Sequence, residues 1–321
     1  MTDTSIAFGP VPSRRLGRSV GINHIPPKVC TYSCVYCQLG RTLNMSRERR
    51  AFYKPEDIMR DVQNKVQKAR ERGESVDYLT FVPDGEPTLD INLGREIDLL
   101  RPLGIKIAVI TNASLMGRED VRNELIKADW VSLKVDTTQT EFWRKVDRPH
   151  GALRLTSILN GALKFAEVFK GELVTETMLV HHINDHEEQV KDVADFLARL
   201  KPRTAYLATP IRPPAEDWAA ACPEEGISRA WQILSEKVDR VEYLIGYEGN
   251  SFAFAGNVEQ DLLSITSVHP MRDDAVRKFL GQAGTDWSVI DRMLGQNLLV
   301  QTEYGGQQFY MRRLKPYRDG H

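Results

Sequence analysis

The 321-residue sequence is short of three things: cysteine, net charge and long apolar runs. Four cysteines with Cys222 remote from the rest do not make a disulfide framework. The formal charge of −1 gives the chain no overall electrostatic preference for nucleic acid or membrane surfaces. No stretch is long enough to cross a bilayer, and the first residues lack the apolar segment of a signal peptide. We therefore expect a cytoplasmic protein with no membrane partner.

The other three cysteines are crowded into the stretch CTYSCVYC, with the spacing C-x3-C-x2-C. In a reducing compartment, crowded cysteines are better interpreted as metal ligands than as disulfides. A zinc knuckle would need a fourth ligand, either His24 or Cys222, and zinc loops usually contain two C-x2-C pairs. The alternative is a [4Fe–4S] cluster held by Cys30, Cys34 and Cys37, which leaves one iron without a protein ligand. Three thiols fit the cluster better, because zinc sites normally have four ligands.

Strand-like and helix-like segments alternate over the first 215 residues. Runs rich in β-branched and apolar residues predict six strands, at 19–25, 76–82, 104–111, 129–136, 172–180 and 203–211. Amphipathic segments predict the helices between them, at 54–73, 94–100, 118–128, 154–169 and 187–200. This alternation predicts an α/β fold with a parallel sheet. Because a closed barrel needs eight units, we expect a partial, TIM-like (β/α)6 barrel.

The pattern changes after residue 215. A segment rich in proline and acidic residues and a helix at 227–238 form a connecting region, 216–260. Helical segments at 272–284 and 285–297 then precede a two-stranded hairpin that turns at Gly305-Gly306. This order is typical of a winged helix-turn-helix domain. We therefore predict a core domain at 1–215 that carries the cysteine loop, the connecting region, and a winged-helix-like domain at 261–321.

The stretch CTYSCVYC resembles the hallmark of the radical S-adenosylmethionine (SAM) superfamily, C-x3-C-x-aromatic-C, at each required position. The resemblance implies a [4Fe–4S] cluster whose free iron is chelated by the amino and carboxylate groups of SAM. Reductive cleavage of SAM would give methionine and a 5′-deoxyadenosyl radical, which abstracts a hydrogen from the substrate. An electron donor such as flavodoxin or ferredoxin would be a partner. Tyr36 would lie against the adenine.

The resemblance extends to the segment after the second strand. The stretch VPDGEPTL is similar to the superfamily's GGE element, with Asp84 in place of the first glycine. It implies that Asp84, Gly85 and Glu86 present backbone carbonyls and a carboxylate to the SAM ammonium. Without the cysteines, the same stretch would be interpreted as an ordinary turn.

Polar residues also mark the ends of the later strands. Asn112, in ITNAS, resembles the TNG of many relatives and would lie at the mouth of the barrel. Ser132, Lys134 and Asp136 share one face of their strand, because strand side chains alternate. The resemblance implies that they hold the ribose hydroxyls and the carboxylate of SAM. The alternative is a structural salt bridge from Lys134 to Asp136 or Glu86. Weaker candidates at the same end of the sheet are Thr175, Thr177 and Thr209.

The substrate is harder to predict. The stretch from Phe8 to Thr42 resembles an uncharacterised branch grouped with wyosine-tRNA synthetase-like proteins, which suggests a tRNA base. Those synthetases carry further cysteines for a second cluster, which Cys222 alone does not supply, so wyosine synthesis is not predicted. Cys222 is interpreted as a small buried apolar residue. A group of basic residues near the expected mouth would either bind phosphates or form an ion-paired surface: Arg14, Arg15, Arg18, Arg47, Arg49 and Arg50.

Two hypotheses of different classes follow. The first is a radical SAM enzyme that acts on an RNA base or a peptide presented by the winged domain. The second is an iron–sulfur, redox-sensing, winged-helix DNA-binding regulator without catalysis. The region 261–321 has eight basic and seven acidic residues, with four of the cations in the tail from Arg312 to Arg318, so it lacks a clear nucleic-acid footprint. The Glu86, Asn112 and Lys134 series favours the enzyme, because a sensor needs no SAM pocket.

Overall fold

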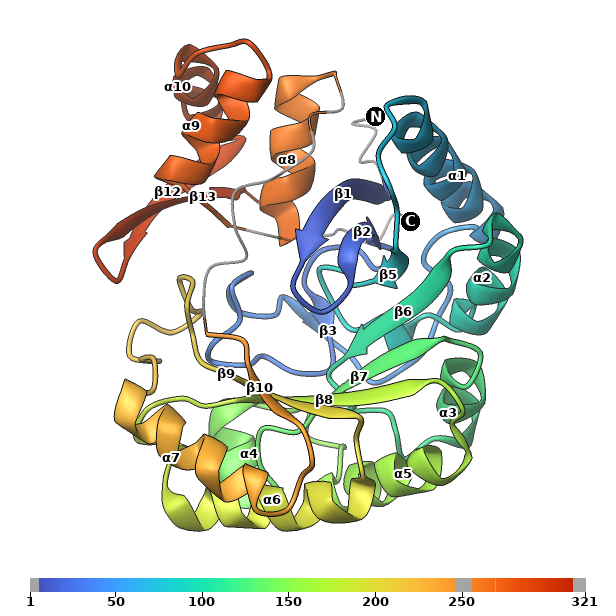
Figure 1. Ribbon diagram of the computed structural model, residues 1–321, viewed down its shortest axis with the longest axis vertical. Coiled ribbons are helices and arrows are strands. Elements are labelled where there is room, and N and C mark those ends of the chain that lie inside the picture. The colour runs from blue at the N-terminus through green and yellow to red at the C-terminus, as the bar shows by residue number, and fades with distance from the viewer. Residues whose placement is uncertain (1–5, 246–253, 255, 269, 314–321) are drawn as a thin grey trace.

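The computed structural model describes residues 6–245, 254, 256–268 and 270–313. Its centre is an eight-stranded sheet with the order β1-β2-β5-β6-β7-β8-β9-β10. From β2 to β10 each strand is parallel to its neighbour, and β1 pairs antiparallel with β2 at one edge. Figure 1 shows the sheet curving into an open barrel. The strands are β1 (Ala7–Ser13), β2 (Gly17–Ile22), β5 (Tyr78–Phe81), β6 (Lys106–Thr111), β7 (Trp130–Lys134), β8 (Glu172–Met178), β9 (Thr204–Ala208) and β10 (Val241–Tyr243).

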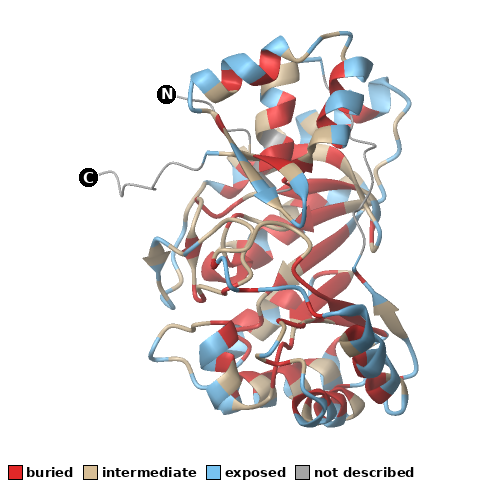
Figure 2. Cartoon of the chain, turned by 90° about the vertical axis from the view of Figure 1, so that its left-hand side faces the viewer, coloured by how far each residue is buried: buried red, intermediate tan, exposed pale blue. Residues whose placement is uncertain are grey.

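Helices cover the outer face of this sheet (Figure 1). They are α1 (Pro55–Glu71), α2 (Leu93–Leu100), α3 (Glu119–Leu125), α4 (Thr140–Val146), α5 (Leu155–Val168), α6 (Glu187–Leu200) and α7 (Glu224–Ser235), with short 3-10 turns at Pro87–Leu89 and Arg101–Leu103. Helix α1 shows why they form. Proline opens it, acidic residues occupy its first turn, and Ile58, Val62 and Val66 form a buried stripe. The sheet under these helices is buried along most of its length (Figure 2).

The predicted parallel α/β sheet is confirmed, and each of the six predicted strands is present as β2 or β5 to β9. Strands β1 and β10 and helix α4 were not predicted. The sequence of β1, AFGPVPS, contains two prolines, which normally argue against a strand, but prolines are tolerated at a sheet edge. Helix α7 and strand β10, from the expected connecting region, extend the same layers by one more unit.

The described residues between Val258 and Arg312 form a second, smaller core, against which Val11 of β1 packs. Its elements are α8 (Val258–Val268), β11 (Met271–Arg272), α9 (Asp273–Gln282), α10 (Ser288–Gly295), β12 (Leu299–Tyr304) and β13 (Gln307–Arg312). The predicted hairpin is confirmed: Gly305 and Gly306 take φ of 56° and 70° between β12 and β13. This C-terminal unit packs beside β1, and Tyr304 donates a hydrogen bond to the carbonyl of Pro210 at 3.0 Å. The tail cations Lys315 and Arg318 lie outside the described residues.

Among the described residues, no helix has the length and apolar character needed to span a membrane. Two short parallel strands, β3 (Val29–Cys30) and β4 (Asn44–Met45), belong to the cysteine loop between β2 and α1. The loop therefore enters at the carboxyl end of β2, where active sites of this fold class are built.

Candidate active site

The cysteine loop is fastened on two sides by backbone hydrogen bonds. On one side it meets the loop after β5: the Lys28 amide donates to the carbonyl of Asp84 at 2.8 Å. On the other side it meets the end of α4, where the Val35 amide donates to the carbonyl of Val146 at 2.9 Å. These bonds fix the path of the chain before Cys30 and around Cys34.

Gly85 allows the first of these contacts. A Cβ on this residue would lie 2.0 Å from the carbonyl oxygen of Val29 and 2.8 Å from Cγ2 of Ile25. Real Cβ atoms do not approach a backbone oxygen this closely, so a side chain here would push the cysteine loop away. The glycine expected to approach SAM thus has a structural role against the residue before Cys30.

The three thiols lie on one loop with polar neighbours at two of them. Cys34 Sγ lies 3.4 Å from Oδ1 of Asp147, and Asn112 donates from Nδ2 toward Cys30 Sγ at 3.5 Å. Burial raises the pKa of the Cys30 thiol to about 12 and raises the pKa of Cys34 and Cys37 as well. Such buried thiols become thiolates when a metal centre supplies compensating positive charge.

The donor set fits a cluster better than a single ion. Within the described part of the chain, no group of three or more His, Cys, Asp and Glu side chains is arranged to hold one metal ion. A zinc ion needs its ligands to converge at about 2.0–2.3 Å. A [4Fe–4S] cluster instead takes each thiolate on a different iron, so three free thiols on one loop suit it.

Neither proposed fourth zinc ligand converges with the three thiols, because no group of three or more His, Cys, Asp and Glu side chains in the described residues could hold a metal ion. His24 is buried, donates from Nε2 to the carbonyl of Pro87 at 3.2 Å, and meets the Phe81 ring edge-on. Burial lowers the pKa of His24 to about 4. Cys222 is buried in the core cluster, where its amide donates to Thr209 Oγ1 at 2.7 Å. The interpretation of Cys222 as a small buried residue agrees with this packing.

Tyr36 connects the cysteine loop to the end of β7. Its hydroxyl donates to Asp136 and lies 3.2 Å from Asp147 Oδ1, while Lys134 Nζ lies 4.8 Å from its ring centroid. Asp136 also accepts the Met178 amide at 2.7 Å. Burial raises the pKa of both Asp136 and Asp147. The structure thus brings three of the predicted residues, Tyr36, Lys134 and Asp136, to one place.

Lys134 forms a salt bridge that the sequence did not predict. Its Nζ lies 2.8 Å from Oε1 of Glu176 on β8, and the other oxygen of Glu176 accepts from Arg15 at 2.7 Å. These two cations hold the pKa of Glu176 at about 2, although burial alone would raise it. The suggested partners of Lys134, Asp136 and Glu86, are replaced by Glu176. The register of β8 against β7 would have predicted this salt bridge, because it places Lys134 and Glu176 side by side in the parallel sheet.

Glu86 is bound within the protein. Its carboxylate accepts from the Thr88 amide at 3.0 Å, from the hydroxyls of Thr88 and Thr111 at 2.5 Å each, and from the Asn112 amide at 2.8 Å. Asn112 in turn donates to Thr31 in the cysteine loop at 2.8 Å. Glu86 therefore joins the ends of β5 and β6 to that loop.

Asp84 has an unused oxygen. Its Oδ2 accepts from Asn23 Nδ2 at 2.8 Å, whereas its buried Oδ1 has no hydrogen-bond partner among the described residues. Burial raises the pKa of Asp84 to about 7. An ammonium group placed here would satisfy this oxygen and favour the ionised carboxylate.

The remaining candidates are buried around the same strands. Ser132 is buried on β7, and Thr175 is buried with no partner for its hydroxyl in the described part of the chain. Thr177 and Thr209 donate to the carbonyls of Val135 and Leu179 at 2.8 and 3.0 Å. The hydroxyls of these two threonines therefore hold the backbone just after β7 and β8.

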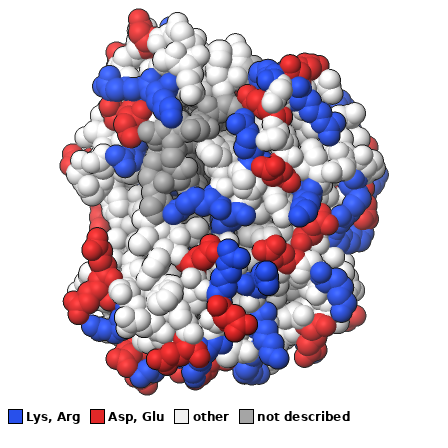
Figure 3. All heavy atoms as spheres, in the orientation of Figure 1, with Lys and Arg blue, Asp and Glu red and all other residues white. Residues whose placement is uncertain are grey.

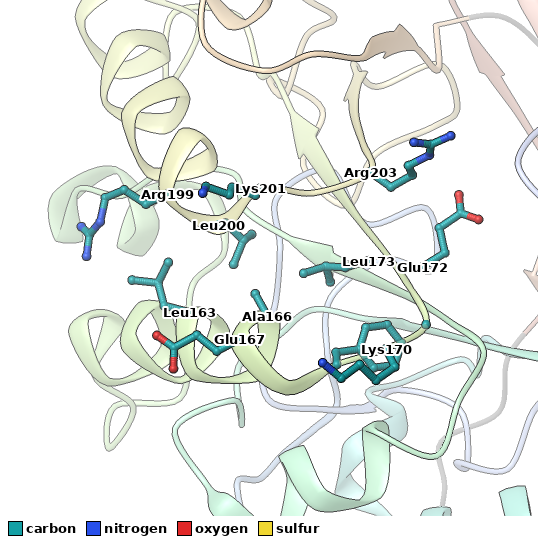
Figure 4. Close-up of a pocket in the computed structure, with 12 residues that line it drawn as sticks. Leu163, Ala166, Glu167, Lys170, Glu172, Leu173, Arg199, Leu200, Lys201 and Arg203 are labelled. Atoms are coloured by element: carbon teal, nitrogen blue, oxygen red, sulfur yellow. The ribbon is translucent and has the colours of Figure 1, made fainter.

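A cavity of about 370 Å³ lies between the cysteine loop and the β1–β2 hairpin. Tyr36, Cys37 and Gln38 line one side, Arg14 and Arg15 line another, and the rest comes from the strands and from the segments that follow β5, β9 and β10. A larger hollow of about 800 Å³, shown in Figure 4, lies by the ends of α5 and α6 and the start of β8 and contains none of the predicted site residues. The smaller cavity is therefore the candidate active site.

The expected basic patch is partly neutralised. Arg15 is paired with Glu176, Arg18 with Glu74, and Arg49 with Asp120 and Glu124. Arg14, Arg47 and Arg50 are exposed. Figure 3 shows basic and acidic side chains interspersed over the face it displays, so ion pairing explains much of the patch.

Known proteins resemble the chain in the same region. The model of the Radical SAM superfamily matches residues 25–197, which include the cysteine loop and strands β5 to β8. The chain belongs to the radical SAM superfamily. A UPF0026 protein of Methanocaldococcus jannaschii is similar to it throughout, with 48% identity and 97% of each chain covered.

Solved structures support the fold of this radical SAM enzyme. A radical SAM methyltransferase from Sphaerobacter thermophilus aligns with a TM-score of 0.51 and 14% identity, covering 71% of this chain and 66% of that one. A TYW1 structure with a lysine–pyruvate adduct bound aligns with a TM-score of 0.51 and 16% identity, covering 69% of this chain and 74% of that one. Members of the superfamily bind a [4Fe–4S] cluster and SAM, and they require a reductant. This enzyme therefore binds both cofactors, the [4Fe–4S] cluster and SAM.

Proposed function

We propose that Cys30, Cys34 and Cys37 hold the [4Fe–4S] cluster and leave one iron for SAM. The observation that carries this proposal is the arrangement around the loop, with Asn112 against Cys30 and Asp147 against Cys34. When bound, the cluster and SAM supply a 5′-deoxyadenosyl radical that abstracts hydrogen from the substrate.

The side chains near the loop have distinct roles in this proposal. Asp84 Oδ1, the acceptor without a partner, binds the SAM ammonium, and Gly85 sets the close approach of the loop. Glu86 positions the loops around the site and is not a main contact of SAM, because four hydrogen bonds from the protein already occupy its carboxylate. Asn112 positions the loop at Cys30.

The groups after β7 complete the SAM site. Lys134 is the cation closest to Tyr36 and binds the SAM carboxylate, while Ser132 and Asp136 serve the ribose hydroxyls. Tyr36 stays oriented by Asp136 and lies against the adenine. The hydrogen bond from Tyr36 of the cysteine loop to Asp136 then holds the adenine contact and the ribose contact next to the cluster ligands.

We further propose that residues 261–321 form a winged-helix-like domain that presents a macromolecular substrate, such as a tRNA base or a peptide. Helices α9 and α10 followed by the β12–β13 hairpin support the winged assignment. The contact between Tyr304 and Pro210 places the hairpin at the end of β9, beside the cavity.

The regulator alternative has less support. Three arginines of the C-terminal unit are paired with acids of the same unit: Arg272 with Asp274, Arg277 with Asp273, and Arg292 with Glu259. Paired surface cations do not form the basic stripe that DNA binding needs. A regulator would also have no use for the orphaned acceptor of Asp84.

The test of the reaction class uses the reconstituted protein without any substrate. Iron, sulfide, SAM and a reductant are supplied anaerobically, and 5′-deoxyadenosine is measured together with the cluster absorbance. We expect slow formation of 5′-deoxyadenosine. The substrate is then sought by comparing modified nucleosides and peptides from cells with and without the gene, and a flavodoxin or ferredoxin is tested as the electron donor.

A further inference from the structure

The turn between β1 and β2 enters the interior of the barrel. Leu16 of this turn is buried in one cluster with Trp130 of β7 and Tyr206 of β9. Beside it, the guanidinium of Arg15 lies 5.8 Å from the Trp130 ring and 5.9 Å from the Tyr206 ring. Cation–aromatic contacts of this kind hold an arginine in one orientation. Arg15 is thus a fixed group of the barrel interior.

Arg15 lines the cavity beside the cysteine loop, and its side chain is only 12% exposed. Its Nη1 donates to Glu176 at 2.7 Å, whereas its buried Nε has no hydrogen-bond partner among the described residues. A buried donor without an acceptor is costly and is normally satisfied by a ligand or a water. Arg15 therefore has a donor that its own protein leaves unused.

The charges that line the cavity are also unbalanced. Arg14, Arg15 and Arg212 contribute three cations, and the one acidic residue in the lining is Glu176. Each oxygen of Glu176 is already bonded to a cation, one to Arg15 and the other to Lys134. The lining thus favours a ligand that brings negative charge of its own.

Lys134 and Arg15 bind different oxygens of Glu176 and differ in their other neighbours. Lys134 faces the Tyr36 ring of the cysteine loop, which makes it the cation available to SAM. Arg15 is enclosed by Trp130 and Tyr206 and belongs to the hairpin on the other side of the cavity. The cavity lining therefore contains a buried cation, Arg15, that is separate from the one assigned to SAM.

We propose that Arg15 is a substrate-specificity residue that binds an anionic group, a carboxylate or a phosphate, on the molecule that loses hydrogen. Glu176 orients the guanidinium through Nη1, and the part of the side chain that lines the cavity meets the substrate anion. The paired N–H donors of an arginine guanidinium match the geometry of carboxylate and phosphate oxygens. The inference rests on the proposed function and narrows its substrate to an anionic molecule or an anionic part of one.

The test uses cluster-loaded protein with SAM bound and two probes, inorganic phosphate and acetate, each titrated anaerobically against chloride at constant ionic strength. Binding is read from the rise in melting temperature. The variants are Arg15→Gln and the matched control Arg18→Gln, whose arginine belongs to the same hairpin but pairs with Glu74 outside the cavity at 3.1 Å.

We expect at least one probe to bind the wild type saturably and to bind Arg15→Gln about tenfold more weakly or worse, as expected for loss of a charged hydrogen bond. Arg18→Gln should bind the probe within twofold of wild type. Substrate-free formation of 5′-deoxyadenosine should be within twofold of wild type in Arg18→Gln, whose arginine lies outside the cavity lining. Binding of phosphate alone identifies a phosphate-bearing substrate, and binding of acetate alone a carboxylate.

Three results would overturn the inference: neither probe binds the wild type, Arg15→Gln binds as the wild type does, or Arg15→Gln loses SAM cleavage as Lys134→Gln does. The last result would assign Arg15 to the cofactor. If Arg15→Gln does not fold, Arg15→Lys is used in its place. Lysine keeps the positive charge but lacks the paired guanidinium donors, so binding of the probe should be several-fold weaker than in the wild type. Wild-type protein that carries an intact cluster and makes no 5′-deoxyadenosine would refute the proposed function separately, whatever the probes do.

Discussion

Replacing Gly85 with alanine perturbs the contact between the loop after β5 and the cysteine loop. The new Cβ would lie 2.0 Å from the Val29 carbonyl oxygen and 2.8 Å from Ile25 Cγ2, so the backbone before Cys30 must move. Gly85 does not have a positive φ, so the cost is steric and not conformational. Overpacking of this kind costs about 1–3 kcal/mol, and a backbone obstacle puts the value near the upper end.

For a chain of this size we expect the melting temperature of Gly85→Ala to fall by about 2–10 °C. The iron content after reconstitution should fall as well, because the displaced residue adjoins the first ligand. The control is Gly151→Ala, where no atom lies within 4 Å of the added Cβ and stability should change by less than about 0.5 kcal/mol. A Gly85→Ala protein with the melting temperature and iron content of Gly151→Ala would refute this account of the glycine.

Three further predictions concern buried groups. Glu176→Gln should destabilise the protein by about 3–5 kcal/mol at neutral pH, because it leaves Arg15 and Lys134 without their shared acid. The pKa of Glu176 is about 2, so its contribution is present above pH 4.5 and is lost as the pH falls toward 2; urea melts should show this acid loss in the wild type and not in the variant. Burial raises the pKa of Glu96 to about 9 and both its oxygens lack partners among the described residues, so its contribution is present below pH 4.5 and is lost as the pH rises toward 9. Glu96→Gln should therefore gain stability over the wild type between pH 5 and pH 9, and equal slopes of melting temperature against pH in the two proteins would contradict this. Cys222→Ala should leave the iron content and cluster absorbance unchanged, and a loss of iron in this variant would revive Cys222 as a ligand.

The sequence was sufficient for the sheet because each central strand is a buried, β-branched run between amphipathic helices. It failed at β1, where prolines disguise an edge strand, and at β10, which has three residues. It also failed at α4, a helix of seven residues. Short elements carry too little periodicity to be recognised without their packing partners.

The site was predictable where a motif carried it and not where pairing across strands decided it. Cys30, Cys34, Cys37 and Tyr36 follow from one contiguous stretch. Glu176 does not, because only the register of β8 against β7 places it beside Lys134. Arg15 was grouped with the basic residues near the expected mouth, which would either bind phosphates or form an ion-paired surface, and the sequence did not show that the hairpin turns it into the barrel. Contacts between residues that lie far apart in the chain cannot be predicted from the residues on either side of each one.

The most direct test of the central claim measures 5′-deoxyadenosine from anaerobically reconstituted protein supplied with SAM and reductant, for the wild type and for Cys34→Ala. The account predicts 5′-deoxyadenosine and cluster absorbance in the wild type, and the loss of both in Cys34→Ala. A wild-type protein with an intact cluster and no 5′-deoxyadenosine, or a Cys34→Ala protein with unchanged cluster absorbance, would contradict it.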